Sequence, residues 1–259
     1  MKKTALLACS LLAIAALSLS SCKKTDDEGV NFVGKWLVYQ TDNPAAYSYY
    51  TFTANGNVEF DDGRGRKFEG TYSYKGDILT VNMPEIAFRE GKTAKVVQSG
   101  MFSTVKGDNN HLSWDMKYYI NDQEMFAKPA NLTMQKDGVG KDDKDFNRLL
   151  GDWDATFEEA QVDAAAVYFL SFGYCVLSDQ SSALIFSTFN IRNGLLTINV
   201  SNTQLGGEQT EYYGTMTGPT TWASDDLFTY DCKSSFTSTE TGETFDAAGL
   251  VKFTRKTAK

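Results

Sequence analysis

The chain has 259 residues, of which 42% are hydrophobic and 13% are aromatic, and its formal net charge at pH 7 is −8. An acidic surface repels a phosphate backbone, so this charge disfavours nucleic acid as a partner. The aromatic content, together with 21 glycines and only 4 prolines, favours compact β structure with tight turns over disorder.

Residues 1–21 have the layout of a secretion signal. Lys2 and Lys3 come first, an apolar run follows from Ala5 to Leu19, and two serines lead up to Cys22. This order of charged, apolar and small residues is typical of a cleaved signal peptide. The apolar run is shorter than the ~18 residues that favour a membrane span, so the sequence predicts a removed segment and not a structural helix.

The residues around Cys22 resemble the lipobox of bacterial lipoproteins, because the cysteine directly follows Leu19-Ser-Ser. The resemblance implies cleavage before Cys22 and acylation of its thiol and new amine, which would anchor the protein to a membrane without spanning it. Residues 22–30 then form a polar tether whose acidic cluster resembles a surface-export signal. We therefore expect a lipid anchor in the bacterial outer membrane, at the cell surface, with the periplasmic face as the alternative.

Residues 31–138 are predicted to form one β domain, because apolar and polar residues alternate between turn signals. Asn55-Gly56 is the clearest hairpin turn. Eight antiparallel strands with short connections suffice to close a barrel. The predicted strands are 34–40, 48–54, 57–61, 67–74, 78–83, 95–105, 111–120 and 131–136.

The interior face of this barrel can be read from two strands. Alternation places Leu112, Trp114, Met116, Tyr118 and Ile120 on one side of their strand. In the same way, Leu79, Val81 and Met83 share a face. Because side chains alternate across a strand, these residues are expected inside the barrel.

Residues 139–148 are predicted to be a linker, and the short run from Phe146 to Leu150 is expected to be helical. A second domain, 149–259, repeats the first. The segment 70–83 recurs 117 positions later as 187–200, with four identical residues. Such self-similarity identifies a duplicated unit. Its predicted strands number only seven: 151–158, 165–177, 183–191, 195–200, 211–217, 226–235 and 249–256.

The predicted fold class is therefore all-β, with two tandem small antiparallel up-and-down barrels of about eight strands each. The Gly-X-Trp motif that opens both repeats, at Trp36 and Trp153, resembles the lipocalin-like or calycin group. In that group the tryptophan plugs one end of the barrel and a late basic residue packs across it. The resemblance implies the pairs Trp36 with Lys136 and Trp153 with Arg255.

Two sets of residues are candidates for binding or cross-linking. The first is the tyrosine cluster of the first repeat, for which core packing is the alternative: Tyr47, Tyr49, Tyr50, Tyr72 and Tyr74. The second is the pair Cys175 and Cys232, which outside the cytoplasm would form either a disulfide or two free thiols. Two isolated cysteines and one histidine do not make a zinc site, so no metal is expected.

The sequence favours a non-catalytic protein without a cofactor. His111 is the single histidine, and alternation places it on the polar face of its strand. The acidic pairs at 61–62, 158–159 and 225–226 are sequence neighbours, which point to opposite faces of a strand and so make poor catalytic pairs. No glycine-rich phosphate loop opens a helix.

Two hypotheses on function remain open. The first is an envelope-anchored binding protein that takes a small apolar or glycan ligand inside a barrel, since an eight-stranded barrel is just wide enough for one small ligand. The alternative is a structural or protein-interaction module of the cell envelope, with filled barrels and no ligand.

Overall fold

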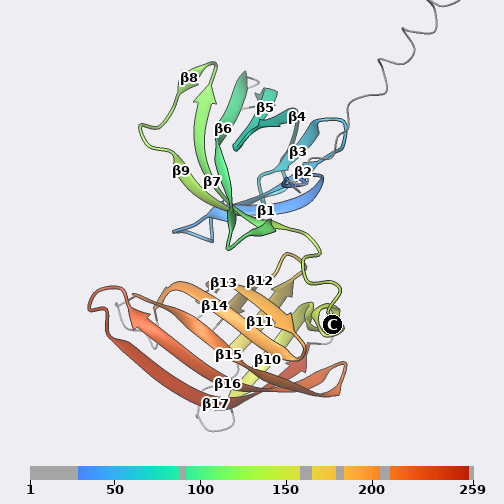
Figure 1. Cartoon of the computed structure of the whole chain (residues 1–259), viewed down its shortest axis with the longest axis vertical. Coiled ribbons are helices and arrows are strands. Elements are labelled where there is room, and N and C mark those ends of the chain that lie inside the picture. Colours follow the sequence, from blue (N-terminus) through green and yellow to red (C-terminus); the bar gives the residue numbers. More distant parts are fainter. Residues whose placement is uncertain (1–28, 88–91, 158–164, 179–183, 205–210, 257–259) are drawn as a thin grey trace, which may run out of the picture. The chain divides into compact units, whose positions relative to one another are not determined.

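The chain folds into two closed, eight-stranded antiparallel up-and-down barrels (Figure 1). The computed structural model describes residues 29–87, 92–157, 165–178, 184–204 and 211–256. The all-β prediction with two barrels is thus confirmed. The predicted signal peptide, Cys22 and most of the tether lie outside the described residues.

In the first barrel the strands from β1 to β7 each pair with their sequence neighbours, and β9 pairs with both β7 and β1 to close the ring. The short strand β8 is an added hairpin on the edge of β7. All eight predicted strands are present, with ends that shift by a few residues. The strands are β1 (Gly34–Gln40), β2 (Tyr47–Phe52), β3 (Asn57–Asp61), β4 (Lys67–Lys75), β5 (Ile78–Ala87), β6 (Thr93–Val105), β7 (Asp108–Ile120), β8 (Gln123–Glu124) and β9 (Ala130–Lys136).

The second barrel has eight strands, and the prediction of seven was wrong. The strand expected over 165–177 is two strands joined by a turn at residues 171–173, where Gly173 has φ +71° and its N–H donates to the Leu170 carbonyl at 3.0 Å. The turn contains the apolar Phe172, so the hydrophobic run continues through it. The strands are β10 (Gly151–Phe157), β11 (Ala165–Leu170), β12 (Tyr174–Ser178), β13 (Leu184–Arg192), β14 (Leu195–Gln204), β15 (Glu211–Ser224), β16 (Leu227–Ser238) and β17 (Thr244–Arg255).

A short helix, α1 (Phe146–Leu149), precedes the second barrel, as predicted. Phe146 and Leu149 are buried in the core of that barrel, and the Phe146 ring stacks on Phe189 at 5.4 Å. Within the described residues, no helix has the length and apolar character needed to cross a bilayer. The helix therefore belongs to the packing of the second barrel.

The predicted interior faces are confirmed in both barrels. In the first, Leu79, Val81 and Met83 are fully buried, as are Leu112 and Trp114. In the second, the equivalent residues of β14 belong to one core cluster that also contains Trp153 and both cysteines. Burial of these large side chains is the main favourable term in the stability of either barrel.

Candidate functional site

A buried tryptophan closes one end of each barrel. The Trp36 Nε1 donates to the Phe32 carbonyl at 2.7 Å, and the Trp153 Nε1 donates to the Leu149 carbonyl at the same distance. The matching distances show that the same local structure was built twice. We call this end of each barrel its closed end.

The structure brings the implied basic residues onto these tryptophans. Trp36 pairs with Lys136 across β1 and β9, and the Lys136 Nζ lies 5.5 Å from the centre of the Trp36 ring. Trp153 pairs with Arg255 across β10 and β17, with the Arg255 Cζ 4.2 Å from the Trp153 ring. Both contacts are cation–π interactions, and burial lowers the pKa of Lys136.

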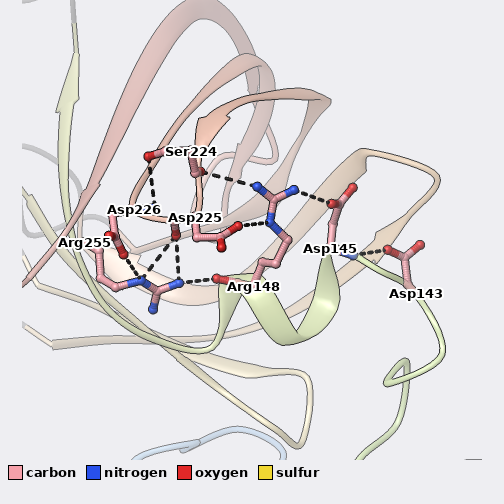
Figure 2. Close-up of polar contacts among 7 residues, drawn as sticks. All are labelled: Asp143, Asp145, Arg148, Ser224, Asp225, Asp226 and Arg255. Atoms are coloured by element: carbon pink, nitrogen blue, oxygen red, sulfur yellow. Dashed lines mark hydrogen bonds and ion pairs between the residues drawn. The ribbon is translucent and has the colours of Figure 1, made fainter.

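Figure 2 shows a denser polar network at the closed end of the second barrel. Arg255 pairs with Asp226 at 2.9 Å, and its Nη1 donates to the Leu150 carbonyl at 2.8 Å. Arg148 of α1 pairs with Asp225 at 3.0 Å, and its Cζ lies 4.1 Å from the centre of the Trp222 ring. The network ties α1 to the β15–β16 turn, so the two neighbouring aspartates act as structural ion-pair partners.

The candidate tyrosines do not gather into one site. Tyr50 and Tyr72 face the barrel interior, whereas Tyr47 and Tyr49 lie on the outer face of β2 with their rings 5.8 Å apart. Tyr74 lies at the closed end and is 52% exposed. The rings therefore divide between the interior and the outer wall, because the alternation of β2 sends neighbouring rings to opposite faces.

Tyr50 is part of the core of the first barrel. Its Oη donates to the Gln98 Oε1 at 2.8 Å inside the barrel, and burial raises its pKa far above the usual range. The Tyr72 Oη donates to the Thr53 carbonyl at 3.0 Å. Both hydroxyl groups thus serve internal hydrogen bonds.

His111 lies on the outer face of β7, half-buried, and burial lowers its pKa. It pairs with Gln135 of β9. Across the described part of the chain, no group of three or more His, Cys, Asp or Glu side chains could hold a metal ion. The acidic pair at 158–159 lies outside the described residues.

Sequence reasoning missed a cavity in the second barrel. This cavity, about 270 Å³ in volume, borders the core on the side away from the closed end. We call it the open-half pocket, and its lining includes Phe157, Met216, Cys232, Ser234, Gly249 and Val251. Among the described residues, the pairing of β10 with β17 runs as far as Phe157 opposite Val251, and Gly249 of β17 is half-buried.

Small side chains create this pocket. In the first barrel the interior pair Gln98 and Tyr118 lies four residues from the Phe102–Trp114 pair. In the second barrel Met216 and Ser234 lie at the same distance from the Thr220–Tyr230 pair. A serine therefore replaces a tyrosine in the matching place, and the volume of the lost ring becomes open space.

The same substitution is visible in the sequence once the repeats are aligned on these strands. Residues 114–120 read WDMKYYI, and residues 230–236 read YDCKSSF. Met116 thus corresponds to Cys232, and Tyr118 corresponds to Ser234. The change from large to small residues at inward positions was the signal that could have located the pocket.

Aromatic rings lie next to the pocket on the same strands. Phe236 pairs with Phe245 two residues beyond the pair Ser234 and Ala247, and the two rings stack at 5.6 Å. The Tyr212 ring meets Phe245 edge-on at 5.5 Å. Phe245 is 43% exposed, so an apolar surface leads from solvent to the pocket.

The two cysteines are free thiols in the structure. Cys232 lines the open-half pocket, and Cys175 is fully buried in the same core cluster. Burial raises the pKa of both thiols, so both are protonated and uncharged at neutral pH. The lining residues that the structure describes are all uncharged, which suits an apolar ligand.

Comparisons with known proteins do not place the chain in a family. No protein-family model matches it, and no curated protein matches its sequence. Among solved structures it is similar to kievitone hydratase from Nectria haematococca, with 9% sequence identity and a TM-score of 0.22 over 87% of this chain and 90% of that chain. A likeness this distant carries no inference about a ligand or a reaction.

Proposed function

We propose that the protein is a non-catalytic binding lipoprotein of the bacterial outer membrane, whose second barrel takes one small apolar ligand in the open-half pocket. The observation that carries this proposal is an uncharged cavity of about 270 Å³ next to the apolar core of that barrel. The resemblance of the residues before Cys22 to a lipobox supports the anchor. The two Gly-X-Trp motifs, which resemble those of lipocalin-like proteins, support a barrel that binds in its interior.

The dimensions of the pocket narrow the ligand class. Its volume lies just below the ~300–1,000 Å³ of ordinary small-molecule pockets, so it suits one ring system or the end of an alkyl chain. A charged group inside would lose its hydration without gaining a partner of opposite charge. The Ser234 hydroxyl supplies one polar contact at the wall.

The chemistry of the pocket favours binding over catalysis. The thiolate is the nucleophilic form of cysteine, and burial raises the pKa of Cys232. His111, the single histidine, belongs to β7 of the other barrel. A hydrolytic or addition reaction at this pocket would thus lack an activated nucleophile and a nearby imidazole base.

The alternative hypothesis, a structural or protein-interaction module with a filled barrel and no ligand, applies best to the first barrel. Trp36, Trp114 and Tyr50 are fully buried inside it, and the Tyr50–Gln98 hydrogen bond crosses its interior. A filled barrel of this kind is suited to supporting its neighbour or presenting an outer surface. We therefore assign ligand binding to the second barrel alone.

A filled-pocket variant tests the binding site. Ser234→Tyr introduces the residue that the first barrel carries in the matching place, and the neutral fluorescent probe N-phenyl-1-naphthylamine reports binding to the folded chain. We expect Ser234→Tyr to weaken probe binding at least tenfold. The control Ser235→Tyr adds the same ring on the exposed face of β16 and should bind as the parent does. If the parent and Ser234→Tyr bind the probe equally well, the proposed binding site is refuted.

Thiol chemistry gives a second and independent readout. Cys232 lines the pocket, whereas Cys175 lies deep in the core. N-ethylmaleimide should therefore modify Cys232 first, and bound probe should slow that reaction. Peptide mass spectrometry distinguishes the two sites. Faster labelling of Cys175, or no protection by the probe, would contradict the proposed pocket.

The anchor is tested separately. The intact mass of protein extracted from membranes should include acyl chains on residue 22, and Cys22→Ser should release the protein into the soluble fraction. Protease treatment of whole cells then distinguishes the cell surface from the periplasmic face. A soluble parent chain would refute the lipid anchor while leaving the binding pocket unaffected.

A further inference from the structure

We infer that the closed end of the first barrel rests on the surface of the lipid bilayer. Three large apolar side chains are exposed there: Tyr74 at 52%, Ile78 at 49% and Met101 at 63%. Val33, just before β1, is also 40% exposed. Together these four residues form what we call the closed-end patch.

The members of the patch are neighbours in space. Ile78 and Met101 are directly paired across β5 and β6. The Tyr74 ring lies 5.2 Å from the ring of Phe32, the residue that precedes Val33. Phe32 also contacts Phe102, which follows Met101, at 5.0 Å. Tyr74 shares the inner face of its strand with Leu79, whereas Ile78 and Met101 lie on the outer wall. The exposed apolar side chains thus gather at one end of the barrel, and such a gathering suits an interaction site.

The second barrel covers part of the corresponding region with its own chain. There α1 inserts Phe146 against Phe189, and Ile191, which matches Tyr74 in the repeat, is only 2% exposed. In the described residues before β1, the first barrel has no such helix. Phe32 is buried at its closed end, but Tyr74 remains 52% exposed, so the two barrels differ in cover at this position.

Val30 and Phe32 precede β1 and are buried, but the residues between Cys22 and Val30 add no apolar side chain to this cover. Residues 23–29 read KKTDDEG and contain no apolar side chain. They do set a distance, because ten residues separate Cys22 from Phe32 and an extended chain of that length reaches at most ~35 Å. If Cys22 carries lipid, as the proposed function requires, the end of the barrel at which the chain enters is held near the bilayer.

The composition of the patch also suits a bilayer surface. Tyrosine is enriched at membrane interfaces, where its ring is buried and its hydroxyl stays hydrated. Lys75 ends β4 beside the patch, and Lys106 lies in the β6–β7 turn at the same end. Long lysine side chains can extend toward headgroups while their stems cover apolar surface. Asp77 and Asp108 occupy the same turns, so apolar insertion and not net positive charge would hold the contact.

The experiment compares two matched positions. Ile78 and Leu195 occupy the same hairpin position in the two repeats and are similarly exposed, at 49% and 50%. In the lipidated chain carrying Cys232→Ser, Ile78→Cys and Leu195→Cys are each labelled with a nitrobenzoxadiazole dye and reconstituted in vesicles of phosphatidylethanolamine and phosphatidylglycerol. We expect a blue shift and about twofold quenching by spin-labelled lipid for Ile78→Cys only.

Three outcomes would overturn the inference. Equal spectra at the two sites would show that position 78 has no special contact with lipid. A blue shift in native envelope fragments but not in pure lipid vesicles would show that a protein covers the patch. If Cys22 carries its lipid but the dye at position 78 shows no blue shift, membrane contact is refuted. The proposed anchor and the proposed ligand pocket would be unaffected by that result. As a second readout, vesicles should slow amide hydrogen exchange in the β4–β5 hairpin relative to the β13–β14 hairpin.

Discussion

Arg255 allows a quantitative test of how the second barrel is closed. Its guanidinium donates to the Arg148 carbonyl and pairs with Asp226 at 2.9 Å (Figure 2). It also donates to the Leu150 carbonyl at 2.8 Å and covers the Trp153 ring. Arg255→Lys keeps the charge but removes the planar fork of donors. The substitution therefore isolates the geometry of these contacts from their electrostatic attraction.

The expected cost follows from the bonds that lysine cannot make. A single ammonium group cannot replace all the contacts to the three carbonyls of Leu150, Arg148 and Asp225, and hydrogen bonds from charged groups contribute about 1.5–3 kcal/mol each. The Arg255 side chain is 27% exposed, so water compensates part of the loss. We expect about 2 kcal/mol of destabilisation, which corresponds to a fall in Tm on the order of 5–10 °C for a domain of this size.

Urea unfolding followed by tryptophan fluorescence measures this loss, and hydrogen exchange should localise it to α1 and β10. Arg192→Lys, at the exposed end of β13, is the matched control and should change the free energy of unfolding by less than about 0.5 kcal/mol. If Arg255→Lys is as neutral as this control, the closed end does not depend on the guanidinium contacts, and the reasoning fails.

Further predictions concern packing, hydrogen bonding and pH. Gly218→Ala should lower the Tm strongly, because its new Cβ would lie 1.8 Å from a backbone oxygen of β16. The Cβ of Gly249→Ala meets nothing within 4 Å, so this variant should be tolerated. Equal Tm values for the two variants would contradict this reasoning. Tyr50→Phe should cost about 1–3 kcal/mol in urea unfolding, because it leaves the buried Gln98 oxygen without its donor; a neutral result would show that the bond is not needed. Burial lowers the pKa of His111 from 6.5, so the unfolded chain binds the proton more readily and stability should fall as the pH drops through 6.5 toward 5. His111→Gln should flatten that part of the pH profile of stability, and an unchanged slope would assign it to other groups.

The sequence was sufficient to predict most of the fold because its alternation is regular and its turns are polar. The structure contains the turns predicted at the Asn-Gly pairs, and it buries Leu79 and Leu112 on the predicted faces of their strands. The prediction failed at residues 171–173, where Phe172 makes the turn as apolar as the strands beside it. The local pattern of apolar and polar residues cannot distinguish such a turn from the strands on either side of it.

The candidate site was harder to predict, because it depends on volume and not on polarity. Tyr49 and Tyr50 were both candidates because they are aromatic, yet a pocket shared by these two rings would have required both faces of β2 to meet. The cavity instead results from Ser234 in a place where the first barrel has Tyr118. Neither residue is unusual in its own strand, and only the comparison of matching positions shows the difference.

The unequal interiors of the two barrels have a consequence for how the protein would respond to a ligand. A cavity weakens the core around it, so the second barrel carries an internal weakness beside Ser234. A molecule that binds the folded barrel and fills this space stabilises it by an amount that grows with the logarithm of the ligand concentration above Kd.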